Sequence, residues 1–91
     1  MTDDELLPLL RIDLGIMGTA YDPQLSHLLK TAKELITREG ITLSDSAEDV
    51  QLMIMYAAYL YRKRATQEGM PRMLRWALNN RLFGGGPHAA R

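Results

Sequence analysis

The sequence of 91 residues predicts a small all-α domain. Apolar residues recur at the i, i+3, i+4 spacing of amphipathic helices, and no stretch of strand length alternates between apolar and polar residues. Glycine, proline and capping residues divide the chain into segments of helical length. The length is that of a single domain. We therefore expect a bundle of about four helices over residues 1–83, followed by a flexible tail over residues 84–91.

The first helix is expected from Thr2 to about Leu14. Thr2 and Glu5 have the spacing of a capping box. The apolar face is a row of leucines: Leu6, Leu7, Leu10 and Leu14. Pro8 conflicts with a helix interior because proline lacks an amide hydrogen and crowds the preceding turn. Gly15 predicts the end of the helix and the start of a loop.

The second helix carries the clearest signals at both ends. Asp22 is expected at the N-cap, Pro23 at the first helical position and Gly40 just beyond the end. The residues between them form one apolar stripe: Leu25, Leu28, Leu29, Ala32, Leu35 and Ile36. His27 falls on the opposite side, so we expect it in solvent and outside any catalytic or metal site.

The third helix is expected from about Ser46 to about Ala65, with Asp49 at capping-box spacing from Ser46. We expect Asp49 to be solvated there, because carboxylates are favoured at helix N-termini. The helix is apolar almost all round, which indicates burial on more than one side. It is therefore either the central helix of the bundle or part of a subunit interface, formed by the residues outside its first apolar face: Leu52, Met55, Tyr56 and Tyr59.

The fourth helix is expected to begin near Pro71, after the break at Gly69, and to end at the triple glycine 84–86. An inward stripe is expected to contain Met70, Met73, Leu74, Ala77 and Leu78. Trp76 lies at the boundary of this stripe, so it belongs either to the core or to an interface.

The net charge of zero conceals a division along the chain. Residues 1–49 hold four Lys or Arg and ten Asp or Glu, whereas residues 50–91 hold seven and one. A chain divided in this way is suited to head-to-tail contacts with its own copies. It is also suited to offering its basic half to nucleic acid or to an acidic protein.

Several classes of function are excluded or disfavoured. There is no cysteine, which excludes disulfides, thiolate metal sites and thiol catalysis. The acidic residues gather at expected helix starts, and no catalytic or phosphate-binding motif is present. The longest apolar run has ten residues, about half a membrane span. We expect a cytosolic protein that is not an enzyme and uses no metal or cofactor.

Two clusters are candidates for partner binding. One is the basic stretch Arg62, Lys63 and Arg64, which is also typical of a helix C-terminus in water. The other surrounds Trp76 on the fourth helix, and it contains Arg72, Arg75, Trp76 and Asn79. Trp and Arg dominate the binding energy of many interfaces, which makes the second cluster the preferred docking element.

The stretches MYAAYLYRKR (residues 55–64) and MPRMLRWALNNRL (residues 70–82) resemble the head–tail connector proteins of long-tailed bacteriophages and prophages, also called adaptor or head-completion proteins. LRID at residues 10–13 and EGITL at residues 39–43 fit the same pattern. The resemblance covers roughly residues 5–83, and none of its motifs is catalytic.

The resemblance implies a structural protein of the virion, assembled in the host cytoplasm. Such connectors form a ring of about twelve copies beneath the portal. The ring continues the DNA channel, where it can contact DNA without sequence preference, and it binds the next neck or tail component. If the portal is needed as a template for ring closure, the free protein is a monomer.

Two alternatives belong to other functional classes. A helix-turn-helix protein would place the fourth helix in the major groove of DNA. Its base or phosphate contacts would come from Arg72, Arg75, Asn79 and Arg81. A generic helical module that binds another protein also fits the composition.

Overall fold

The structure is a computed structural model of the chain, and it describes residues 2–66 and 69–84. Its four helices are α1 (Asp3–Leu14), α2 (Asp22–Arg38), α3 (Ala47–Thr66) and α4 (Arg72–Gly84). No strand occurs in these two ranges, so the predicted all-α fold is confirmed. The predicted tail over residues 84–91 begins one residue too early, because Gly84 is the last residue of α4, and residues 85–91 lie outside the described residues.

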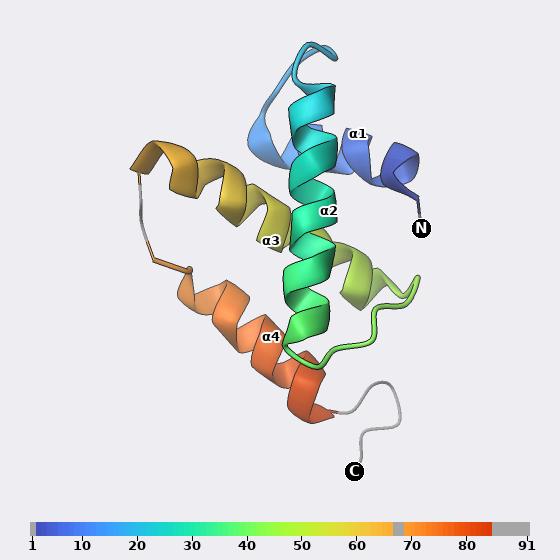
Figure 1. Cartoon of the computed structure of the whole chain (residues 1–91), viewed down its shortest axis with the longest axis vertical. Helices are drawn as coiled ribbons and strands as arrows, with labels where there is room; N and C mark the ends of the chain where they lie inside the picture. Colours follow the sequence, from blue (N-terminus) through green and yellow to red (C-terminus); the bar gives the residue numbers. More distant parts are fainter. Residues whose placement is uncertain (1, 67–68, 85–91) are drawn as a thin grey trace.

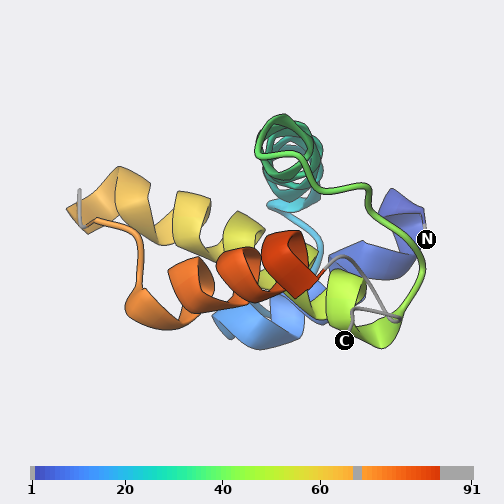
Figure 2. The same ribbon diagram turned by 90° about the horizontal axis from the view of Figure 1, so that it is seen from below.

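Helix α3 is the centre of the bundle, because each of the other three helices packs on it. Figure 1 shows α2 crossing α3, and Figure 2 shows α4 running alongside α3 while α2 covers a different side. This arrangement explains why α3 is apolar almost all round. Its buried residues point in several directions and include Leu52, Met53, Ile54, Tyr56, Ala57 and Ala58.

Helix α1 begins at Asp3 with Thr2 as its N-cap, as predicted. The Glu5 carboxylate accepts hydrogen bonds from the Thr2 amide (2.9 Å) and the Thr2 hydroxyl (3.3 Å). Pro8 lies inside the helix but on its exposed side, where water can solvate the carbonyl that loses its partner. Leu6 and Leu10 are fully buried on the opposite side.

The predicted apolar stripe of α2 is confirmed. Leu25, Leu28, Leu29, Ala32 and Ile36 are buried, and Leu35 is half-buried. Gly40 follows the helix with a φ of 102°, in the left-handed region that favours glycine.

The predicted N-cap of α2 is wrong, because the helix already includes Asp22 and its N-cap is Tyr21. The Asp22 carboxylate instead accepts two hydrogen bonds from Arg11 of α1, at 2.9 Å from Nε and 3.3 Å from Nη2. The two bonds form a bidentate, charge-assisted pair, which adds geometric specificity to the attraction. It joins the end of α1 to the start of α2.

The expectation that Asp49 is solvated is also wrong, because its side chain is completely buried. The carboxylate accepts hydrogen bonds from Arg81 Nε (2.7 Å) and Nη2 (3.1 Å), and from the amide and hydroxyl of Ser44 (2.8 Å each). Arg81 Nη2 also donates to the carbonyl oxygen of Thr42 at 2.7 Å. Arg81 therefore fixes α4 to the first turn of α3 and to the loop before it.

These contacts also set the ionisation of Asp49. Burial by itself raises the pKa of the carboxyl, since it disfavours the charged form. The hydrogen bonds from Arg81 and Ser44 outweigh that effect, and the pKa lies below its ordinary value. Asp49 therefore stays ionised in the folded protein.

Replacing Leu29 with alanine should lower the free energy of unfolding by about 2–5 kcal/mol, as truncation of a buried leucine does. Urea denaturation followed by circular dichroism measures the change. Lys30→Ala, at an exposed position next to it, should change stability by less than about 0.5 kcal/mol. A similarly small effect of Leu29→Ala would contradict the packing of α2 on α3.

Asp49→Asn should cost about 3–5 kcal/mol near neutral pH, since one partner of a buried ion pair is lost. Because the folded-state pKa of Asp49 is lowered, the unfolded chain binds its proton first, and the stabilisation is lost as the pH falls below about 4. The difference in unfolding free energy between wild type and variant should therefore shrink in acid. Glu48→Gln, one residue earlier and exposed, is the matched control. A difference that stays constant down to pH 2 would disprove the role of the Asp49 charge.

Candidate partner-binding surface

Helix α4 exposes three large apolar side chains on the side that faces away from the core. Met73, Trp76 and Phe83 are 65%, 60% and 80% exposed. At 100° per residue they share one face, and the buried Leu74 and Leu78 lie on the other. We call Met73, Trp76 and Phe83 the α4 outer stripe. Such a row on one short helix is typical of a surface that binds a partner.

Trp76 is therefore exposed, which decides between the core and the surface position that the sequence left open. Met73, which was expected in the core, is exposed as well. The reason is that α4 packs mainly on α3 alone. One neighbouring helix covers only a narrow stripe, which Leu74 and Leu78 fill.

A groove of about 300 Å³ runs between α3 and α4 beside the outer stripe. Its lining residues are Glu48, Gln51, Leu52, Met55, Met73, Trp76, Ala77 and Asn80. A second hollow, between the end of α1 and the same two helices, shares Met55 and Met73 with it. The Trp76 region of α4 and part of the predicted interface of α3 therefore adjoin and form one continuous surface.

The predicted interface on α3 is only partly accessible. Leu52 and Tyr56 are buried by the chain itself, so they belong to the core and offer little area to a subunit. Met55 and Tyr59 are half-buried. The Tyr56 and Tyr59 rings meet edge to face with their centroids 6.0 Å apart, and burial raises the pKa of Tyr56.

The polar residues of α4 fall into two groups. Arg75 is held by Glu39 at the end of α2, with two bonds of 3.0 and 3.2 Å, and Arg81 is held by Asp49. The side chains of Arg72 and Asn79 are exposed and have no hydrogen bond or ion pair with the part of the chain that the structure describes. Asn80 is exposed as well and lines the groove described above. Arg72, Asn79 and Asn80 are therefore the polar groups available to a partner beside the outer stripe.

The basic stretch Arg62, Lys63 and Arg64 does not form one face. Arg62 approaches Asp13 of α1 (3.8 Å), whereas Lys63 lies over the Tyr59 ring with its Nζ 5.8 Å from the centroid. Arg64 turns toward Gln24 of α2. With its amide oxygen facing Arg64, Gln24 accepts hydrogen bonds from the Arg64 guanidinium. Consecutive helical residues point 100° apart, so the three cations diverge.

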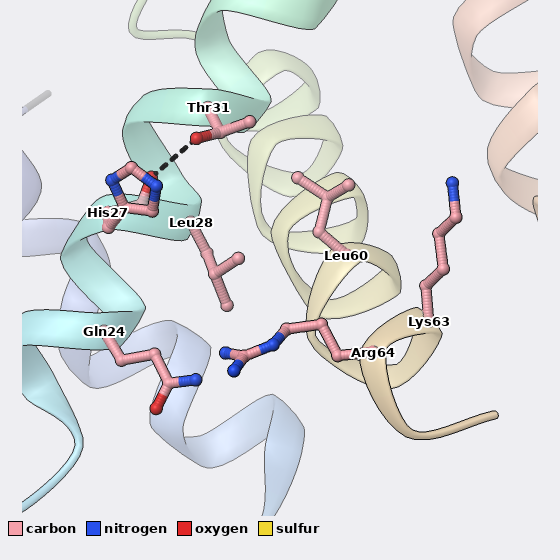
Figure 3. A pocket seen from close by; sticks show the side chains of 7 residues that line it. All are labelled: Gln24, His27, Leu28, Thr31, Leu60, Lys63 and Arg64. Atoms are coloured by element: carbon pink, nitrogen blue, oxygen red, sulfur yellow. Dashed lines mark hydrogen bonds between the residues drawn. The ribbon is translucent and has the colours of Figure 1, made fainter. Parts of the chain in front are cut away.

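Lys63 and Arg64 border an open cleft between α2 and α3, shown in Figure 3. The other lining residues are Gln24, His27, Leu28, Thr31 and Leu60. His27 is exposed, as predicted, and its backbone carbonyl accepts a bond from the Thr31 hydroxyl at 3.0 Å. The cleft is cationic and suits an anion better than a metal ion.

Among the described residues, no three or more metal-ligating side chains lie close enough together to hold a metal ion. None of their helices is both long and apolar enough to pass through a lipid bilayer.

Comparison of the chain with protein-family models, curated proteins and solved structures found no match. The function is therefore inferred from the residues and their geometry.

Phe83 was not among the residues that the sequence predicted at the surface. The available signal was its spacing from Met73 and Trp76, which places all three on a second face of the same helix.

Phe83→Ser should change the free energy of unfolding by no more than about 0.5 kcal/mol, because the side chain is largely in solvent. Leu78→Ala, on the inner side of the same helix, should cost about 2–5 kcal/mol. Thermal or urea unfolding of the two variants distinguishes the two faces. Equal losses for both would show that Phe83 packs in the core.

Proposed function

We propose that this protein is a structural subunit of a phage or prophage head–tail connector. It docks beneath the portal, continues the DNA channel and joins the head to the tail. The observation that carries the proposal is the α4 outer stripe, which exposes Met73, Trp76 and Phe83 from a helix whose other side is part of the core. The resemblance of residues 5–83 to connector proteins supports a connector as the kind of assembly.

The stripe has the composition of an interaction surface. Trp is enriched among the residues that dominate interface energies, and Met adapts its shape to a partner. Arg72 is exposed and carries a planar guanidinium that can bind a carboxylate through two bonds. A central aromatic residue with an adjacent arginine supports docking on another protein.

The helix is also held firmly in place before any partner binds. The Arg81–Asp49 pair anchors its C-terminal half and the Arg75–Glu39 pair anchors its N-terminal half. A surface fixed in its bound orientation loses less conformational entropy on association. Rigidity of this kind supports a role as a joint between larger components.

In this role the partners are the portal protein, the next neck or tail component and further copies of the chain in a ring. The protein acts in the virion at the head–tail interface, after assembly in the host cytoplasm, and needs no enzyme activity or cofactor. The cleft with Lys63 and Arg64 supports contact with the DNA phosphates in the channel without sequence preference.

The observations favour this proposal over a helix-turn-helix DNA-binding protein. Two of the four side chains that would contact DNA, Arg75 and Arg81, are bound within the chain by Glu39 and Asp49. The face of α4 that is free centres on the apolar Met73, Trp76 and Phe83, which suits a protein surface better than a phosphate backbone. A generic helical module would use the same stripe with a different partner.

The experiment is co-expression of the chain with the portal protein encoded in the same genome. We expect the wild type to co-purify with the portal ring. Trp76→Ser should reduce the recovered amount at least tenfold, because copies that no longer join through the α4 outer stripe bind the portal singly and more weakly, while circular dichroism shows an unchanged fold. His27→Ala, exposed on α2, is the control and should bind like wild type. Failure of the wild type to bind the portal would overturn the proposal, and salt-sensitive binding of duplex DNA in its place would favour the helix-turn-helix alternative.

A further inference from the structure

We propose that the α4 outer stripe of one copy packs against the outer side of α1 of a second copy, in a head-to-tail contact. This inference rests on the proposed function, because it names the surfaces through which the subunits of such an assembly meet. It goes beyond that function because it excludes a contact between like surfaces.

The outer side of α1 is the second apolar surface that a helix of this bundle leaves open. Leu9 is 42% exposed and Ile12 is 77% exposed. They are one helical turn apart and lie on a side of the helix next to the one that buries Leu6 and Leu10. We call Leu9 and Ile12 the α1 outer ridge. Its two branched side chains are suited to pack against the flat ring of Trp76.

The charges of the two helices are complementary. Helix α4 contains three arginines and no acidic residue, whereas α1 contains four acidic residues and one arginine. Arg75 and Arg81 are already paired with Glu39 and Asp49, so Arg72 is the arginine of α4 that can attract a neighbour. A second α4 offers Arg72 no acidic side chain, whereas α1 does. Like charges brought into contact destabilise an interface, while opposite charges stabilise it. The occupant of the α4 stripe is therefore α1 of another copy.

The two helices also match in length. At 1.5 Å per residue, the 12 residues of α1 span about 18 Å and the 13 residues of α4 span about 20 Å. Each copy has one α1 outer ridge and one α4 outer stripe. Two copies joined by one contact therefore still have one free ridge and one free stripe. Such a heterologous contact repeats, and it closes into a ring when the rotation between copies permits.

The test uses two variants of the whole chain, Trp76→Ser and Ile12→Ser, each with one surface impaired. Sedimentation equilibrium up to about 1 mM detects contacts even of millimolar affinity. The wild type should self-associate, and each variant alone should bind itself at least tenfold more weakly. A 1:1 mixture should form a dimer containing one copy of each, because the intact α4 of one variant meets the intact α1 of the other.

Two additional variants keep the result interpretable. Phe83→Ser, at the most exposed position of the stripe, replaces Trp76→Ser if circular dichroism shows that the latter is unfolded. Met17→Ser alters an even more exposed apolar residue in the loop after α1 and should associate like wild type. Raising the NaCl concentration from about 0.05 M to about 0.5 M should weaken the wild-type contact, because salt screens surface charges.

The inference is overturned if Ile12→Ser associates like wild type, if the mixture forms no mixed dimer, or if the wild type stays monomeric at about 1 mM. These results are separable from failure of the proposed function. Portal binding by the wild type together with normal association of Ile12→Ser would refute the α1–α4 contact alone. A head-to-tail contact without portal binding would refute the connector function alone.

Discussion

The buried ion pair between Asp49 and Arg81 is the contact on which the position of α4 depends. Asp49 has no exposed surface, and its carboxylate accepts four hydrogen bonds, two from Arg81 and two from Ser44. A buried carboxylate is tolerated only when its charge is paired and its oxygens are satisfied. Helix α4 packs mainly on one neighbour, through a stripe that includes Leu74 and Leu78. The pair therefore supplies the orientation that so narrow an apolar contact does not define.

The same constraint produces the surface that we assign to assembly. Because Arg81 and Arg75 hold α4 flat against α3 and the end of α2, the opposite side of the helix faces solvent along its length. That side carries Met73, Trp76 and Phe83. Anchoring through charges allows the inner face to be narrow, and a narrow inner face leaves room for a second apolar stripe on a helix of only 13 residues.

The division of charge along the chain has an internal role as well as an external one. Two acidic residues of the N-terminal half, Glu39 and Asp49, bind Arg75 and Arg81 of the C-terminal half within one molecule. Arg72, the arginine of α4 that has no such partner in the described part of the chain, lies beside the outer stripe. Attraction between the halves thus stabilises the monomer first, and the remaining charges are those available to a second copy or a portal.

The sequence by itself determined what depends on neighbours within a few residues. These features are the four helices to within about two residues at their ends, the buried stripe of α2 and the exposure of His27. Turn chemistry and helical periodicity are local, so one chain segment is enough to define them. Tertiary structure alone decided that Asp22 binds Arg11, that Leu52 and Tyr56 are core residues and that Met73 is exposed. The apolar character of α3 indicates burial on several sides but not which helix covers each side. Asp49 and Arg81 are 32 residues apart, and only folding brings them together, since no periodicity extends across two helices and a loop.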